Sequence, residues 1–328
     1  MAKQNASRTA GLGASPVQVT IADLVRWQAR ANKLPTRRQF RARAALAGQH
    51  QSRFRGRGVD YLESRHYLPG DDIRNMDWRV TARTGRAHTK VFQEERERPV
   101  VLLLDRNPSM YFATRGVLKS VMAAHLAALL AWSTVRSGDR IGGFAFGGEQ
   151  HHELEPAGGR RGAMRLIKPL VEWMNPPSQK PERETLATAL GRLRRVARPG
   201  TLVVILSDFY HQDEELERQL SRLRQHNDVM ACQILDPIEA RGLPLGSYPV
   251  TDGEQQQILQ LRNQHDFQRQ QVQLQAAYGR TPELLRRHGC RTWVALTTDD
   301  PLDALWRGTQ NQAAAAHTAS QQLPGGSE

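Results

Sequence analysis

The sequence predicts an α/β protein in which helices cover both faces of a mostly parallel sheet. Two apolar runs, Val100–Leu104 and Thr201–Leu206, have the composition of strands that are buried on both faces. Segments with apolar residues at helical spacing, such as Gly116–Val135, alternate with these runs. Because this alternation is typical of βαβ units, we expect one doubly wound domain over residues 99–309, preceded by a smaller module.

The N-terminal helix is predicted from its capping residues. Thr20 followed by Asp23 resembles a capping box, and Pro35 would end the helix that begins there. A second short helix is expected over Thr36–Ala47. The small, polar residues 1–18, before the first helix, are expected to form a disordered tail.

The stretch from residue 53 to 98 is rich in glycine, charge and turn signals. It offers only short strand candidates, at Asp60–Glu63 and Ala87–Phe92. Together with the preceding helices it is predicted to form a basic module of helix, strand and loop over residues 19–98.

The remaining elements follow in turn along the larger domain. Further strands are predicted at Arg140–Phe146, Val229–Leu235 and Thr292–Leu296. Helices are predicted over Arg161–Met174, Thr185–Ala197 and Glu214–His226, and a long glutamine-rich helix is expected to end at Pro282–His288. Residues 310–328 are expected to form a second disordered tail.

Composition excludes several classes of protein. Of the 328 residues, 39% are hydrophobic and 24% are charged, which is typical of a globular chain. The longest strongly apolar run is Val121–Trp132, whereas a membrane-spanning helix needs about 20 residues. We therefore expect no membrane span. The two cysteines form no CxxC motif, which favours a reducing, cytoplasmic compartment.

Basic charge is concentrated near the N-terminus. Residues 1–98 hold 20 Lys and Arg against 9 Asp and Glu, and the stretch Arg37–Arg57 holds seven arginines and no acid. Nucleic acid, an anionic lipid surface or an acidic protein could each bind it, or it could be a solvated surface. The stretch holds only Phe40 and Phe54 as aromatic residues, which is few for a base-stacking platform.

Aspartates follow both apolar strands, at the edge where doubly wound sheets bind ligands. No dinucleotide or P-loop motif and no nucleophile elbow occurs, and no general base accompanies the aspartates, so we do not expect an enzyme. The loop after the first strand offers oxygens from Asp105, Asn107 and Ser109, which Thr185 and Asp208 could complete. Such a set could hold Mg²⁺ for docking. Alternatively, the aspartates cap the following helices.

Residues 99–306 resemble a von Willebrand factor type A domain. The resemblance implies a metal-ion-dependent adhesion site for Mg²⁺ made of Asp105, Asn107, Ser109, Thr185 and Asp208. Asn107 stands where that family has serine, and Arg106 places a cation beside the site.

The preceding stretch resembles the signature of the DUF58 family, which directly precedes a von Willebrand A-like domain. The resemblance rests on Gly56–Gly58, Arg65–Arg74, Asp77–Arg79, Ala82–Arg83 and Phe92–Glu95. Many members carry an N-terminal membrane hairpin, and this sequence resembles the short form without it.

Two readings of the signature remain open. Its charged residues could form ion pairs that fix the basic module to the sheet, with Trp78 in an apolar seat, or they could form an exposed surface that a partner recognises. The residues concerned are Arg65, Tyr67, Gly70, Asp71, Asp72, Arg74, Asp77, Trp78, Arg79 and Arg83.

The DUF58 resemblance also implies partners. Members are commonly encoded beside MoxR-type AAA+ ATPases and are thought to assemble or activate other proteins with them. We therefore expect a cytoplasmic, non-enzymatic adaptor that acts with such an ATPase on a client protein. The alternative is a nucleic-acid-binding protein that uses Arg37–Arg57.

Overall fold

The computed structural model describes residues 15–34, 59–68, 71–94, 97–148, 152–176, 184–210, 212–251 and 256–308. The chain divides into two compact units. The larger contains Met1–Gln49 and Arg98–Glu328, and the smaller is His50–Glu97.

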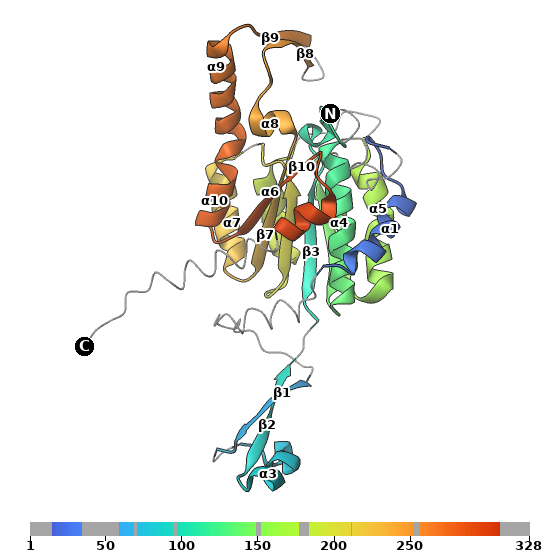
Figure 1. Ribbon diagram of the computed structural model, residues 1–328, viewed down its shortest axis with the longest axis vertical. Coiled ribbons are helices and arrows are strands. Elements are labelled where there is room, and N and C mark those ends of the chain that lie inside the picture. The colour runs from blue at the N-terminus through green and yellow to red at the C-terminus, as the bar shows by residue number, and fades with distance from the viewer. Residues whose placement is uncertain are drawn as a thin grey trace, which may run out of the picture. The chain divides into compact units, whose positions relative to one another are not determined.

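The larger unit is built on a six-stranded sheet in the order β10-β7-β6-β3-β4-β5 (Figure 1). Five strands are parallel, and β5 pairs antiparallel with β4 at one edge. The bounds are β3 Pro99–Asp105, β4 Arg140–Phe146, β5 His152–Ala157, β6 Leu202–Ser207, β7 Asp228–Leu235 and β10 Arg291–Leu296. The predicted α/β class, a mostly parallel sheet with helices on both faces, is confirmed, although β5 was not predicted.

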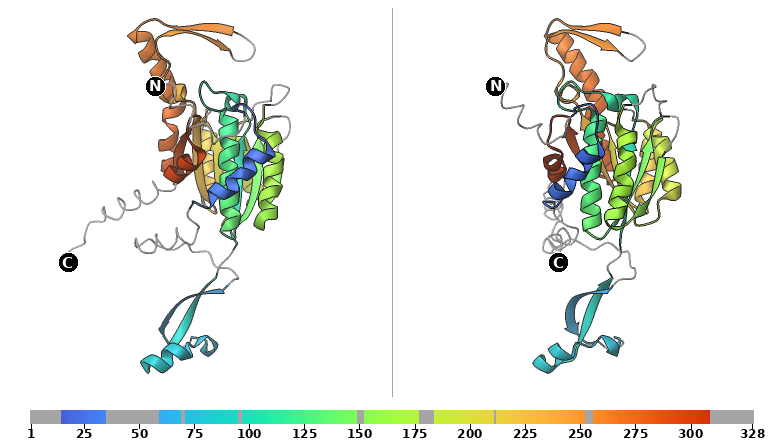
Figure 2. Two further views of the ribbon diagram at one scale, coloured as in Figure 1. Left: turned by 45° about the vertical axis from the view of Figure 1, so that its right-hand side comes forward. Right: turned by 90° about the vertical axis from the view of Figure 1, so that its right-hand side faces the viewer.

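Helices cover both faces of this sheet (Figure 2). One face carries α1 (Ile21–Ala31), α4 (Lys119–Arg136), α5 (Gly159–Met174) and the helical residues 301–308. The other carries α6 (Leu186–Val196), α7 (Glu214–Arg224) and α10 (Thr281–Arg287). Because side chains alternate along a strand, Leu102 and Leu104 of β3 pack under the first group, whereas Val101 and Leu103 pack under the second.

Helix α1 corrects two predicted boundaries. Its capping box forms as predicted, but Trp27 Nε1 donates to His125 Nδ1 of α4 at 2.8 Å, so α1 belongs to the larger unit rather than to a module over residues 19–98. The carbonyl of Pro16 accepts from Leu118 N at 2.9 Å, so the end of the predicted tail over residues 1–18 is tied to α4. The change in charge along the sequence therefore does not mark the boundary between the units, because the apolar side chains of α1 are buried in the larger unit.

Some predictions lie outside the described residues. These are the rest of that tail, the short helix over Thr36–Ala47, the arginines of Arg37–Arg57, and the tail over residues 310–328.

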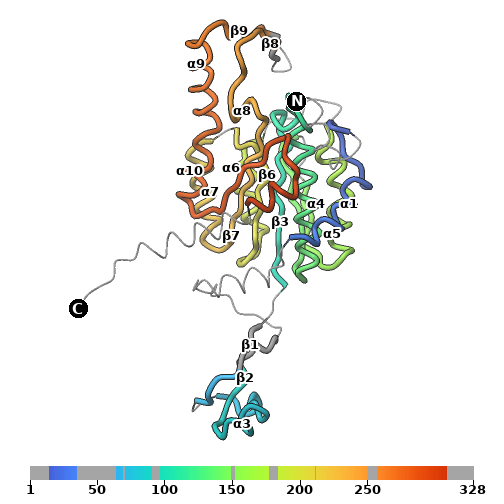
Figure 3. The backbone as a smooth tube through the Cα atoms, viewed as in Figure 1, coloured from blue at the N-terminus to red at the C-terminus, as the bar shows by residue number. Residues whose placement is uncertain are grey.

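The glutamine-rich segment is an arm rather than one long helix. Strands β8 (Gly246–Thr251) and β9 (Gln256–Leu261) form an antiparallel hairpin, and α9 (Gln264–Leu274) follows it. A π-helical turn, η4 (Gln275–Gly279), joins α9 to α10. The tube in Figure 3 traces this arm past the carboxyl ends of the parallel strands. No residue of α9 is buried, which explains why its apolar periodicity was weak.

The smaller unit is a hairpin with two short helices. Strand β1 (Val59–His66) pairs antiparallel with β2 (His88–Glu94), which confirms the two strand candidates. The 3-10 helix η2 (Ile73–Asn75) and α3 (Trp78–Thr84) lie between them in sequence. Helix α3 ends at Gly85, whose φ of 70° suits glycine.

Over the described part of the chain, no helix is both long enough and apolar enough to span a membrane.

Candidate functional site at the carboxyl edge of the sheet

The two predicted aspartates lie at the ends of neighbouring strands. Asp105 ends β3, and Asp208 directly follows β6. In the sheet, β3 lies between β4 on one side and β6 on the other, so the strand order reverses its direction at β3. This is the topological switch point, where doubly wound sheets bind ligands. Both side chains are buried, with 3% and 1% of their residue surface exposed.

Asp105 is surrounded by hydrogen-bond donors of the protein. Its Oδ2 accepts from Ser207 Oγ at 2.6 Å, and its Oδ1 accepts from Asn107 N and Nδ2, each at 2.8 Å. Burial, followed by the negative charge of Asp208, raises the pKa of Asp105 to about 7, although these hydrogen bonds act in the opposite direction. Both carboxylate oxygens are therefore in use.

Asn107 joins the loop after β3 to the residue before the N-cap of α6. Its Nδ2 donates to the Glu184 carbonyl at 2.9 Å, and its Oδ1 accepts from Glu184 N at 3.0 Å. The neighbouring Gly147 has a φ of 85°, and a Cβ there would lie 2.8 Å from Asn107 N. The carboxamide is thus a structural bridge whose oxygen already has a donor.

Lys119 is the functional candidate that sequence reasoning missed. It is the first residue of α4, its side chain is 0% exposed, and its Nζ lies 2.8 Å from Asp208 Oδ2 and 2.7 Å from Glu239 Oε1. Burial alone would lower the pKa of this lysine, but the charges of Asp208 and Glu239 outweigh it and raise the pKa. The available signal was a lysine at the start of an otherwise apolar helix.

Glu239 extends the buried cluster to the arm. It lies in α8 (Pro237–Arg241), and its Oε1 also accepts from the Tyr278 hydroxyl at 2.8 Å. Its Oε2 accepts from Asp236 N at 2.8 Å, which completes the capping box of α8. Burial and then the charge of Glu239 raise the pKa of Tyr278, so this phenol stays a donor. Tyr278 belongs to the π-helical turn η4.

The remaining residues of the predicted metal set are placed differently. Thr185 is exposed, and its Oγ1 accepts from Thr188 N at 3.1 Å as the N-cap of α6. Ser109 is half-buried in the 3-10 turn η3 (Pro108–Tyr111). Arg106 donates from Nε to the Trp173 carbonyl of α5 at 2.9 Å, so its guanidinium is held by α5.

This donor set does not fit a divalent cation. Mg²⁺ needs about six oxygens. Here the oxygens of Asp105 and Asn107 accept hydrogen bonds from the protein, and the Asp208 carboxylate binds the ammonium of Lys119. Within the described ranges, no group of three or more His, Cys, Asp or Glu side chains is arranged to hold a metal.

The chain after Asp208 adopts a strained turn. Phe209 has a φ of 55°, and its N donates to Ser207 Oγ at 2.9 Å. The next residue, Tyr210, is 46% exposed, and its ring centroid lies 5.8 Å from that of Tyr278. Aromatic surface therefore lies beside the buried charges.

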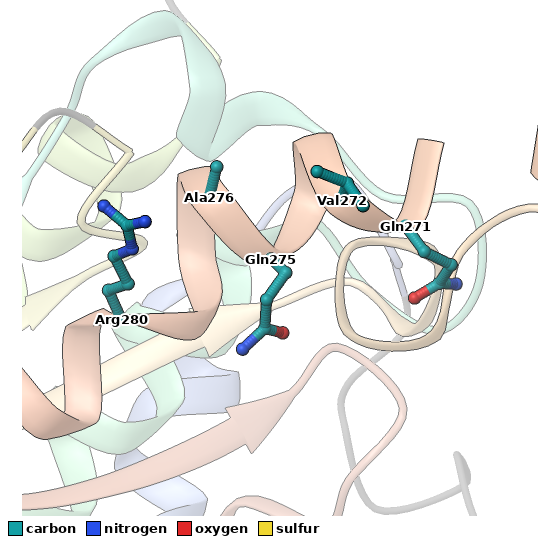
Figure 4. Close-up of a pocket in the computed structure, with 5 residues that line it drawn as sticks. All are labelled: Gln271, Val272, Gln275, Ala276 and Arg280. Carbon is teal, nitrogen blue, oxygen red and sulfur yellow. The ribbon is translucent and has the colours of Figure 1, made fainter. Parts of the chain in front are cut away.

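An open groove runs along the arm (Figure 4). It is lined by Gln271, Val272, Gln275, Ala276 and Arg280 of α9, η4 and the residue that follows them. Its side chains are amides and small apolar groups with one cation, and they include no nucleophile or acid–base pair.

In the smaller unit, the acidic residues of the predicted signature hold its backbone. Asp71 accepts from Arg65 at 2.7 Å, and Asp72 accepts from Arg74 N at 3.0 Å. Asp77 caps α3 by accepting from Val80 N at 3.1 Å. The amide of Leu68, and then Arg65, lower the pKa of Asp71, whereas the Ser64 hydroxyl, and then the Val80 amide, lower that of Asp77.

Trp78 and three arginines of the predicted signature are exposed. Trp78 is 66% exposed, so the described part of the smaller unit by itself provides no apolar seat for its ring. Arg74, Arg79 and Arg83 are exposed, and none makes an ion pair with a carboxylate among the described residues, where Arg65–Asp71 is the pair that forms. Tyr67 is half-buried and bonds through its N to the Ala87 carbonyl, and Gly70 lies outside the described residues.

Comparison with known proteins gives one family and several distant structures. A family model described as "Protein of unknown function DUF58" matches residues 63–281. Uncharacterized proteins of Mycobacterium tuberculosis (strain ATCC 25618 / H37Rv) and Mycobacterium bovis are each 31% identical over 209 residues, which cover 64% of this chain and 65% of theirs. The chain thus spans slightly less than two thirds of these relatives.

Among solved structures, the hypothetical protein BatB from Bacteroides thetaiotaomicron is 13% identical, with a TM-score of 0.42 over 66% of this chain and 99% of that one. A von Willebrand factor type A protein from Catenulispora acidiphila is 14% identical, with a TM-score of 0.36 over 70% and 45%.

Proposed function

Because the chain belongs to the DUF58 family, we propose that it is a non-enzymatic adaptor that binds a MoxR-type AAA+ ATPase and helps it to assemble or activate a client protein. The ATPase is the partner class that the family resemblance implies. A reducing cytoplasm is the proposed compartment, and the free, buried state of Cys232 and Cys290 supports it.

The observation that carries this proposal is the signature surface, which we define as Leu68, Ile73, Arg74, Trp78, Arg79 and Arg83. Its apolar members are 58%, 65% and 66% exposed for Leu68, Ile73 and Trp78. Large apolar side chains that gather on one small unit mark interaction sites, and tryptophan is among the residues that contribute most to binding energy.

Charge narrows the kind of partner. The three arginines of the signature surface have no carboxylate partner among the described residues. A protein surface with carboxylates around an apolar pocket would pair with the arginines and cover Trp78. We therefore propose that the ATPase presents an acidic face to this surface.

The carboxyl edge supports the non-enzymatic part of the proposal. The charged groups of the cluster at this edge are all buried, with 9% or less of their residue surface exposed, and Lys119 is paired with Asp208 and Glu239; they are Lys119, Asp105, Asp208 and Glu239. General acid–base catalysis requires a group within hydrogen-bond reach of a bound substrate. These enclosed side chains therefore stabilise the folded structure and do not act on a substrate.

Binding of the full chain to the purified MoxR-type ATPase from the same source tests the proposal. Trp78→Ala is expected to raise the dissociation constant about thirtyfold, which corresponds to a loss of about 2 kcal/mol of binding free energy. The matched control is Val272→Ala on α9, where Val272 is also exposed (69%) and no change is expected.

A second pair of variants tests the charge argument. Arg79→Ala/Arg83→Ala should weaken binding and reduce its dependence on salt, whereas Arg194→Ala/Arg195→Ala on α6 should not. Equal losses from both pairs would mean unspecific attraction and contradict the proposal. So would unchanged ATPase binding together with nucleic-acid binding whose affinity falls steeply with salt, since that is the behaviour of the alternative function.

A further inference from the structure

We infer that the Lys119 ammonium is a built-in cation that replaces a divalent metal at the carboxyl edge, so that this edge is assembled and closed without metal. The inference concerns residues of the larger unit and does not depend on the identity of any partner.

The first argument is charge balance in a desolvated place. Asp105, Asp208 and Glu239 are buried acidic side chains, with 3%, 1% and 9% of their residue surface exposed. Buried carboxylates need a cation or a dense set of donors, because desolvation of an unpaired charge is costly. Lys119 supplies the cation, with its side chain 0% exposed and its Nζ within 2.8 Å of two carboxylates.

The second argument counts the oxygens that a metal would require. Asp208 uses Oδ2 for Lys119 and Oδ1 for Tyr210 N at 3.1 Å. Asp105 uses both oxygens for Ser207 and Asn107. A metal at this edge would have to displace several of these bonds and also expel or repel a buried ammonium.

The third argument is that the ammonium itself is well accommodated. It donates to two carboxylates, and its Nζ lies 5.8 Å from the ring centroids of both Phe112 and Tyr278. Those distances are within the range of a cation–π contact. Glu239 is in turn fixed by Tyr278 and by the backbone of Asp236, so no member of the cluster is left to recruit an ion.

The replacement changes what the edge can do. A bound metal has open coordination positions and can accept a carboxylate from a partner, and chelation removes it. An ammonium fixed to α4 and fully enclosed has neither property. Recognition of a carboxylate through a metal at Asp105 and Asp208 is therefore not available, and the edge keeps its structure at any divalent-cation concentration.

The experiment measures metal response in the full chain and in matched variants. Thermal unfolding of the wild type is followed in EDTA and in about 5 mM MgCl₂ or MnCl₂, because a ligand that binds the native state raises the melting temperature. Mn²⁺ binding is measured separately by electron paramagnetic resonance. We expect no shift and no saturable Mn²⁺ site in the wild type. A rise of several degrees with a saturable site would overturn the inference.

Lys119→Met removes the charge while keeping a chain of similar length. We expect a large fall in melting temperature in EDTA and partial recovery in Mn²⁺, because uncompensated carboxylates then face one another. Lys119→Arg keeps the cation and should stay indifferent to metal. A Lys119→Met variant that keeps the wild-type melting temperature in EDTA would contradict the inference.

A further variant covers the case in which Lys119→Met does not fold. Lys119→Met/Glu239→Gln removes one charge of each sign, so we expect it to fold in EDTA and, because no ammonium then holds Asp208, to respond to Mn²⁺ more than the wild type does. A double variant that folds with the wild-type melting temperature in EDTA and gains no Mn²⁺ response would show that the ammonium does not take the place of a metal and would overturn the inference.

Discussion

At the carboxyl edge of the sheet, charged side chains lie inside the protein, whereas on the signature surface the apolar side chains lie outside it. Lys119 is 0% exposed and paired, and Trp78 is 66% exposed. Each region reverses the usual distribution of polar and apolar groups. In each, the residues concerned belong to a sequence motif or contact one.

The two reversals have different consequences. A buried pair whose oxygens all have donors is already satisfied and has nothing to gain from a ligand. An exposed tryptophan beside arginines without carboxylate partners gains from being covered. The comparison teaches that the region that resembles a metal-binding motif, the Asp105 loop, is the one whose groups are already in use.

The largest expected effect comes from breaking the buried cluster at Glu239. Glu239→Ala removes the acceptor of Lys119, Tyr278 and the Asp236 amide, so it should reduce the free energy of unfolding by about 3–5 kcal/mol, measured by urea denaturation. The matched control is Glu283→Ala, which removes an exposed ion pair of α10 and should cost at most about 1 kcal/mol. If both variants lost the same small amount of unfolding free energy, the cluster around Glu239 would have to be in contact with solvent.

A smaller effect is expected from giving the edge the serine of the adhesion motif. Asn107→Ser loses both hydrogen bonds to the backbone of Glu184, which should cost about 1–3 kcal/mol without any gain in Mg²⁺ response. Asn75→Ser in the smaller unit is the control, and it should stay within about 0.5 kcal/mol because the Asn75 side chain has no hydrogen bond among the described residues. A variant made more stable by Mg²⁺ would mean that residue 107 alone decides metal binding.

Much of the fold could be predicted because its signals are local. Val100–Leu104 and Thr201–Leu206 are apolar enough to be buried strands by themselves, and Thr20 with Asp23 specifies a helix start. Aspartates at strand ends could be placed at one edge because parallel strands end together.

The state of the candidate site could not be predicted because its contacts are long-range. Lys119 reaches Asp208 and Glu239 from 89 and 120 residues away in sequence, and its place at the start of an apolar helix does not indicate these partners. Asn107 offered an oxygen to a metal only as long as its bond to Glu184, 77 residues away, was unknown. The exposure of Trp78 could not be predicted for the same reason, because it depends on whether residues distant in sequence pack against the ring.

The carboxyl edge and the turn of the smaller unit that contains Asp71 should respond to pH in opposite directions. Burial and the charge of Asp208 raise the pKa of Asp105 from 3.8 to about 7, so the folded state binds the proton more tightly than the unfolded chain. Its contribution to stability is full below pH 3.8 and is lost as pH rises toward about 7. The pKa of Asp71 is lowered by the Leu68 amide and Arg65, so its contribution is present above the unfolded pKa and is lost in acid.

Carboxyl titration by NMR in the wild type, with Asp105→Asn and Asp71→Asn for assignment, checks this contrast. Asp105 should titrate near neutral pH, and Asp71 should titrate below the usual range of an aspartate. If both carboxyls titrate in the usual range, the distinction between a desolvated edge and a solvated, hydrogen-bonded turn fails.

The smallest expected effect on stability is at Trp78, although its expected effect on binding is among the largest. Because the ring is 66% exposed, Trp78→Ala removes little buried surface and should change the free energy of unfolding by no more than about 0.5 kcal/mol. Trp27→Ala is the contrasting variant: Trp27 is 2% exposed and bonded to His125, so its loss should cost about 3–5 kcal/mol. Urea denaturation of both variants measures the difference. A loss at Trp78 as large as that at Trp27 would mean that the ring packs within the protein in solution, and the signature surface would then be a structural joint rather than a surface open to a partner.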